Sequence, residues 1–259
     1  MAGDWPEAVP SFQGFPLPSE AKFAAMPIGG MEYRCVASSP TGFVQQLAAC
    51  YLPHGYWFYV QGFVPKDKDP TQVDAKLIAK YGIGVSRQSR ARRKAVGIAN
   101  VHYLRYRHTF LLLATHGHHP FYDEETESIR DARKIPIKFY GYSISVQKGG
   151  FLRKLKADDS PIPDDRWRVR VQIRREEYEA LKAYYLDRAV HASPESLTAA
   201  LFNVPYEPYA PVRQQMLNLL RLVNAKRRTA GLQPLASDVL RYRRRIVKPF
   251  DWPDDRAAA

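Results

Sequence analysis

A histidine run in the middle of the chain is the best candidate for metal chemistry. His116, His118 and His119 follow an apolar segment, and acidic residues begin at Asp123 and Glu124. On a strand, His116 and His118 would project to the same face. Imidazole and carboxylate groups together bind divalent metals, and a metal beside a phosphate promotes phosphodiester cleavage. If the chain is an enzyme, we therefore expect Mg²⁺ or Mn²⁺ on His116, His118 and Glu124, with Asp123 as a further catalytic carboxylate.

The spacing of these histidines resembles the His-hydrophobe-His motif of the single-strand endonucleases that start rolling-circle replication or move small insertion sequences. In that family two histidines on a strand of an antiparallel sheet bind the metal, and a tyrosine on a nearby helix is the nucleophile. The resemblance implies Tyr184 or Tyr185 as that nucleophile and a mobile element as the setting. It spans residues 116–119, and Gly117 stands where the family has a bulky residue. An activated water is the other candidate nucleophile, and histidines that only cap a sheet and contact phosphate are the alternative to a metal site.

The charge of the chain points to a polyanionic partner. Lys and Arg number 39 against 26 Asp and Glu, which gives a formal net charge of +13. A basic protein of this kind attracts nucleic acid, and the guanidinium group suits both phosphate contact and stacking on bases. The residues that we expect to contact nucleic acid lie in a middle segment, on one strand and near the C-terminus: Arg87, Arg90, Arg92, Arg93, Lys94, Arg105, Arg107, Arg168, Arg170, Arg227, Arg228, Arg241, Arg243, Arg244, Arg245 and Lys248.

We expect these cations to converge on one surface, so that affinity falls steeply as salt rises. Tyr103, Tyr106 and Tyr242 lie among them, and exposed rings there would stack on unpaired bases. The sequence therefore predicts a protein that binds DNA or RNA, in single-stranded or structured form. Two alternatives remain open: a metal-dependent endonuclease or strand transferase that uses His116 and His118, and an assembly subunit of a larger nucleoprotein particle.

Several other classes of site are not indicated. The chain has no nucleotide-binding glycine motif, no Gly-x-Ser-x-Gly elbow and no His-Glu-x-x-His zinc motif. Cys35 and Cys50 form no CxxC pair, which argues against a disulfide framework and against a thiolate zinc site. No apolar run approaches the length of a membrane span. We expect a cytoplasmic protein without a membrane partner, associated with the nucleoid if it binds DNA.

Residues 167–174 carry the clearest strand signal in the chain. Apolar and polar side chains alternate strictly there, which places one set on a core and the other in water. The alternation predicts a basic outer face with Arg168 and Arg170, and a core face made of Trp167, Val169, Val171 and Ile173.

The remaining elements predict an α+β fold with a mainly antiparallel sheet, helices on one face and a helical, basic C-terminal extension. Residues 100–106 and 109–115 predict a hairpin, and residues 121–134 a helix with acidic residues first and basic residues last. Further helices are expected to begin after the capping residues Asp69, Ser86 and Ser193. The expected organisation is a disordered Pro-rich leader, a nucleic-acid-binding α+β domain and a helical basic region, over residues 1–30, 31–192 and 193–259.

Overall fold

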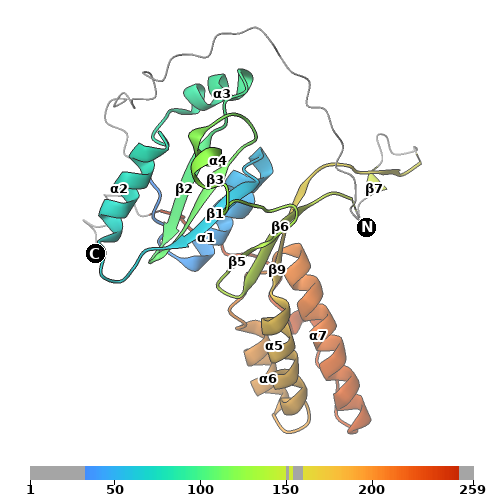
Figure 1. Ribbon diagram of the computed structural model, residues 1–259. Helices are drawn as coiled ribbons and strands as arrows, with labels where there is room; N and C mark the ends of the chain where they lie inside the picture. The colour runs from blue at the N-terminus through green and yellow to red at the C-terminus, as the bar shows by residue number, and fades with distance from the viewer. Residues whose placement is uncertain (1–32, 150–151, 154–159, 251–259) are drawn as a thin grey trace, which may run out of the picture.

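The computed structural model describes residues 33–149, 152–153 and 160–250, and Figure 1 shows their arrangement. Within these residues, helices are combined with antiparallel sheets, so the predicted α+β fold is confirmed. The predicted leader of residues 1–30 lies outside the described residues. No helix in the described part of the chain is both long enough and apolar enough to cross a bilayer.

The larger sheet has the strand order β2-β3-β1-β4, and its neighbouring strands are antiparallel. Its strands are β1 (Phe58–Phe63), β2 (Val101–Tyr106), β3 (Thr109–Ala114) and β4 (Arg130–Asp131). The predicted hairpin is confirmed, because β2 and β3 pair along their whole length. Arg107 lies in the connecting turn with a φ of 52°, the left-handed conformation that tight hairpin turns use.

The smaller sheet, with the order β5-β6-β9, is also antiparallel. It consists of β5 (Ile137–Phe139), β6 (Tyr142–Gln147) and β9 (Arg168–Ile173), while β7 (Leu152–Arg153) pairs separately with β8 (Ile162–Pro163). The alternation predicted for β9 is found in its second half, where Val171 and Ile173 are buried while Arg170 is exposed. Trp167 departs from the prediction, because it precedes the strand and its residue surface is 38% exposed.

Seven α-helices occur in the described residues: α1 (Pro40–Gln46), α2 (Pro70–Lys80), α3 (Arg87–Ala95), α4 (Pro120–Glu124), α5 (Arg175–Arg188), α6 (Pro194–Phe202) and α7 (Ala210–Thr229). The predicted caps are confirmed, since Asp69, Ser86 and Ser193 accept backbone N–H groups at the starts of α2, α3 and α6. The helix predicted over residues 121–134 is wrong. α4 ends at Glu124, and the chain then extends as β4 because Arg130 and Asp131 pair with β1.

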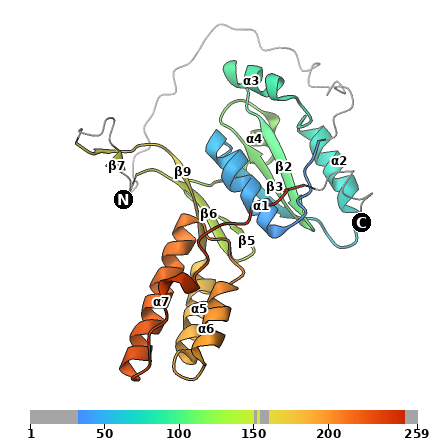
Figure 2. The same cartoon turned by 180° about the vertical axis from the view of Figure 1, so that it is seen from behind.

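Helices pack on both faces of the larger sheet, whereas the sequence predicts them on one. Successive side chains of β2 point to opposite faces. Leu104 and Tyr106 share a hydrophobic cluster with α1, and Figure 2 shows this helix crossing the sheet. Tyr103 and Arg105 point the other way, where both contact Asp74 of α2.

The C-terminal helices extend from the smaller sheet, below the larger one in both views (Figures 1 and 2). The buried stripe of α7 includes Met216, Leu219, Leu220 and Val223. The side-chain amide of Gln215 bonds both the N–H and the C=O of Ile173, at 2.8 and 3.0 Å, and so fixes α7 to β9. One hydrophobic cluster runs from α1 through the smaller sheet to α7, so the helices share their core with the sheets.

Candidate nucleic-acid interface

Hydrogen bonds on one side of helix α3 fix it to the residues beside it. Arg90 donates to the carbonyl of Ile83 at 2.9 Å, and Arg93 donates to that of Gly82 at 3.3 Å. Asn100 in turn donates to the backbone carbonyl of Arg90 at 2.9 Å. Both arginines are half-buried, and they position α3 instead of presenting their charges fully to solvent.

The opposite side of α3 is strongly cationic. Arg87, Arg92 and Lys94 are exposed there. Residues 75–122 contain no Asp or Glu, so the surrounding segment supplies no carboxylate to neutralise these groups. Both views place α3 at the far end of the larger sheet, away from the C-terminal helices (Figures 1 and 2). The outer side of α3 is therefore exposed and positively charged.

Two of the predicted phosphate-binding arginines instead lie in the interior. Arg105 is 8% exposed and its guanidinium is paired with Asp74, while Arg107 beside it is exposed and lies 5.4 Å from the Tyr106 ring centroid. Arg227 is 2% exposed and donates to the carbonyls of Gln233 and Ala189, which ties the ends of α7 and α5 together. Arg105 and Arg227 are thus structural residues, and we exclude them from the interface.

The basic face of β9 is partly neutralised. Asp164 is buried and accepts hydrogen bonds from Arg168 and, at 2.9 Å, from Arg166. Arg170 is exposed and donates to the side chain of Gln147 at 3.2 Å. This face therefore carries less free positive charge than its sequence indicates.

The basic tail, which we define as residues 241–248, surrounds one buried acid. Glu207 is 4% exposed and accepts from Arg241 at 3.3 Å, from the backbone N–H of Arg245 at 2.8 Å and from the Arg245 side chain at 3.3 Å. Arg244 lies 4.6 Å from the centroid of the Tyr209 ring. The exposed residues of the tail include Arg243, Arg244, Arg245 and Lys248.

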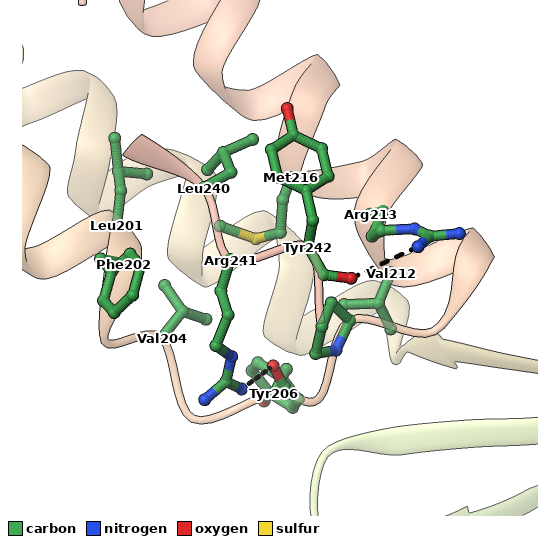
Figure 3. A pocket seen from close by; sticks show the side chains of 11 residues that line it. Leu201, Phe202, Val204, Tyr206, Val212, Arg213, Met216, Leu240, Arg241 and Tyr242 are labelled. Atoms are coloured by element: carbon green, nitrogen blue, oxygen red, sulfur yellow. Dashed lines mark hydrogen bonds between the residues drawn. The ribbon is translucent and has the colours of Figure 1, made fainter. Parts of the chain in front are cut away.

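A small cavity of about 20 Å³ lies between α6, α7 and the basic tail (Figure 3). Arg241 points along its edge and donates to the carbonyl of Tyr206 at 2.9 Å, and Arg213 donates to that of Tyr242 at 3.3 Å. The remaining lining is mainly apolar, with Leu201, Val204, Val212, Met216 and Leu240. A space of this size accommodates about one water molecule, so it is a packing feature of the tail.

The predicted convergence of all basic segments on one surface is wrong. α3 lies at one end of the molecule, and α7 extends away from the sheets toward the other end, where it reaches Arg227 and the exposed Arg228 (Figures 1 and 2). The basic tail crosses between these ends, since Phe250 bridges to Ala37 beside α1. The cations are therefore distributed along the molecule, and α3 forms a separate group.

The histidine run does not lie on a strand. β3 ends at Ala114, and Gly117 follows with a φ of 137°. His118 then pairs through its backbone with Gly97 and Ala99, at the C-terminal end of α3. The side chains of His116 and His118 are exposed, whereas His119 is buried and accepts the N–H of Phe121 as the cap of α4. Burial, with a smaller effect of the Arg93 charge, lowers the pKa of His119.

The predicted metal ligands and nucleophiles are not brought together. Glu124 pairs with Lys80 at 2.6 Å, and the described residues contain no group of three or more His, Cys, Asp or Glu side chains arranged to hold a metal. Asp123 is exposed on α4. Tyr184 and Tyr185 lie on α5, which both views place at the opposite end of the molecule from α4. Tyr185 is also buried, with its hydroxyl bonded to the carbonyl of Ala200 at 2.9 Å.

One aromatic and cationic cluster is not predicted by the sequence patterns, and it consists of Trp57, Trp167, Arg133 and Lys148. The ring centroids of Trp57 and Trp167 are 5.4 Å apart, and the guanidinium carbon of Arg133 lies 4.6 and 5.5 Å from them. The ammonium group of the exposed Lys148 lies 5.2 Å from the Trp167 ring. The available signal was Trp167 itself, an aromatic residue between Arg166 and Arg168, which the strict alternation assigned to the core.

The tyrosines proposed for base stacking differ in their accessibility. Tyr103 is fully buried and Tyr106 is nearly so, which leaves neither ring free to stack on a base. Tyr242 is exposed in the basic tail. Trp167 is therefore the better placed ring, because Arg133 and Lys148 supply charge beside it.

No family model, curated protein or solved structure matches this chain.

Proposed function

We propose that this chain binds nucleic acid, with the solvent-facing side of α3 as its main contact. The observation that carries the proposal is the charge on that side, where Arg87, Arg92 and Lys94 are exposed and the surrounding segment has no acidic residue. Phosphate groups are the natural counterpart of such a surface, and each cation that meets a phosphate releases a counterion. A cytoplasmic, nucleoid-associated location is the corresponding proposal if the partner is DNA.

The fixed position of α3 supports the proposal. The bonds of Arg90, Arg93 and Asn100 hold the helix in place before any partner arrives. A surface that is already ordered loses less conformational entropy on binding. The cluster of Trp57, Trp167, Arg133 and Lys148 adds a second contact, since an exposed ring beside cations suits an unpaired base.

Neither alternative has comparable support. The separation of α5 from the histidine run leaves Tyr184 and Tyr185 away from His116 and His118. No observation on the described residues favours an assembly subunit over a simple binder. Adding Mn²⁺ to the binding reactions tests strand cleavage in the same samples.

The test compares two variants that remove the same charge from exposed helical positions. Arg87→Ala with Lys94→Ala changes α3, and Arg221→Ala with Arg228→Ala changes α7. Fluorescence anisotropy with labelled DNA and RNA across a salt series should show weaker binding for the α3 variant, with a salt slope smaller by about 2. The α7 variant should keep most of its affinity. Equal losses in both variants, or a loss in the α7 variant alone, would overturn the assignment to α3.

A further inference from the structure

The nine residues of α3 divide cleanly into two sides. Ser89, Arg90 and Arg93 are half-buried and face the molecule, and the other six positions are exposed. With about 100° between successive residues, the exposed positions cover roughly 160° of the circumference without interruption. In order around the helix they are Lys94, Arg87, Ala91, Ala95, Gln88 and Arg92.

This order places the smallest side chains in the middle and the longest ones on both flanks. Ala91 and Ala95 form the centre of the exposed side, so the helix backbone can approach a partner closely. Arg87 and Lys94 lie on one flank. Gln88 and Arg92 lie on the other, and both side chains can make paired hydrogen bonds to base edges.

We propose that α3 enters the major groove of duplex DNA with Ala91 and Ala95 toward the base edges. The inference rests on the proposed nucleic-acid binding and names its partner. The major groove of B-form DNA is about 12 Å wide and admits an α-helix. In this position Arg87 and Lys94 contact phosphates along one wall, and Gln88 and Arg92 reach the bases.

Duplex DNA fits this side of α3 better than duplex RNA does. The major groove of A-form RNA is deep and narrow, so a helix cannot enter it. A single strand has no groove that would fit the small side chains of Ala91 and Ala95 between the long side chains on either side of them. The bonds that hold α3 in place also leave its exposed side free to enter a groove, because Arg90 and Arg93 make them on the side that faces the molecule.

The decisive variant adds bulk without changing charge. Ala91→Leu places a larger side chain at the centre of the exposed side, and Ala225→Leu is its control at an exposed position of α7. Both replace alanine by another good helix former, so α3 and α7 should stay folded. Circular dichroism and the melting temperature verify this. Gln88→Ala is a second variant, which removes a base-contacting group and adds no bulk.

Binding is measured by fluorescence anisotropy with a mixed-sequence DNA duplex, the RNA duplex of the same sequence and the single DNA strand. We expect Ala91→Leu to weaken duplex DNA binding about tenfold, with a smaller loss for Gln88→Ala and no loss for Ala225→Leu. RNA duplex and single-strand binding should be weaker in the unmodified protein and unaffected by Ala91→Leu. Bound protein should also protect guanine N7, which lies in the major groove, from dimethyl sulfate.

The outcomes separate this inference from the proposed function. Unchanged duplex DNA affinity in Ala91→Leu and Gln88→Ala, or guanine N7 that stays reactive in the complex, would overturn the groove assignment while nucleic-acid binding stands. Preference for the RNA duplex or for the single strand would overturn it as well. Failure of the unmodified protein to bind any of the three nucleic acids at low salt would end both proposals.

Discussion

Arg105 and Asp74 form a buried, two-pronged ion pair that joins β2 to α2. The Nε and Nη2 atoms of Arg105 lie 2.7 and 2.6 Å from the two carboxylate oxygens, and Tyr103 donates a further bond to Asp74 at 2.6 Å. Nη1 of Arg105 donates to the carbonyl of Arg107 at 2.6 Å, which supports the hairpin turn. The guanidinium group of Arg105 therefore stabilises the fold and is not available to bind phosphate.

Breaking this pair should destabilise the protein without a direct effect on nucleic-acid binding. In Arg105→Met the buried Asp74 carboxylate loses its partner, and we expect the free energy of unfolding to fall by about 3–5 kcal/mol. Urea unfolding measures this change. Arg107→Met, at the exposed neighbouring position, is the control and should change the unfolding free energy little. Equal stability of the two variants would contradict the structural role given to Arg105.

His102 should make the protein sensitive to acid. Burial, with a smaller effect of the Arg90 charge, lowers its pKa from 6.5 to about 3. The folded state therefore keeps His102 neutral, while the unfolded chain binds a proton below pH 6.5. Stability contributed by the neutral ring is fully present above pH 6.5 and is lost between that pH and about 3, by up to about 1.4 kcal/mol per pH unit.

Replacing His102 tests this sign. His102→Gln should flatten the acid limb of the plot of unfolding free energy against pH, even if it lowers stability at neutral pH, where the bond to Tyr33 at 2.9 Å is altered. His191→Gln, at an exposed position, is the control and should leave the slope unchanged. An acid limb equally steep in the unmodified protein and in His102→Gln would rule out this titration.

Gly117 explains why the histidine run cannot follow the endonuclease pattern. A Cβ at this position would lie 2.6 Å from both the backbone nitrogen of Ala99 and the carbonyl oxygen of Gly97, and its φ of 137° is strained for any other residue. Gly117→Ala should therefore lower the free energy of unfolding by about 1–3 kcal/mol. It should also weaken nucleic-acid binding, because it disturbs the attachment of His118 to the end of α3.

A second glycine separates the effect of crowding from that of backbone conformation. Gly149 also has a positive φ, of 76°, but a Cβ there meets nothing within 4 Å among the described residues. Gly149→Ala should therefore be milder than Gly117→Ala in chemical unfolding, and it should leave binding unchanged. Similar losses in both variants would show that the contact with Gly97 and Ala99 has no special importance.

The starts of α2, α3 and α6 and the buried face of β9 could be predicted because each depends on residues close to it in the sequence. Asp69, Ser86 and Ser193 cap the helices that follow them, and the alternation in the second half of β9 indicates which of its faces is buried. The end of α4 did not follow, since β4 forms only through pairing with β1. Side-chain caps act within a few residues, whereas strand pairing depends on distant parts of the chain.

The roles of individual arginines were harder to predict than the overall charge. Arg105 depends on Asp74, a partner 31 residues away that α2 brings across the sheet. Arg227 did offer a signal, because it lies four residues after Val223 and therefore on the buried stripe of α7. The distribution of the basic segments depends on how α3 and α7 are placed in the fold, which no single segment determines.

The Trp57 and Trp167 pair should report on single-stranded ligands. The exposed ring of Trp167 lies beside Arg133 and Lys148, and an unpaired base that displaces the Lys148 side chain would stack on it. We expect a single-stranded oligonucleotide to quench tryptophan fluorescence. Trp167→Ala should weaken single-strand binding by about 1–3 kcal/mol, because a stacked base is lost, and should leave duplex DNA affinity nearly unchanged.

Tyr242→Ala is the matched control for Trp167→Ala, since Tyr242 is an exposed ring among the arginines of the basic tail. If charge around an exposed ring were sufficient, both variants would lose single-strand affinity equally. If the close approach of Arg133 and Trp57 to Trp167 creates the stacking site, only Trp167→Ala should lose it. Loss in Tyr242→Ala alone would instead move single-strand binding to the basic tail, far from α3.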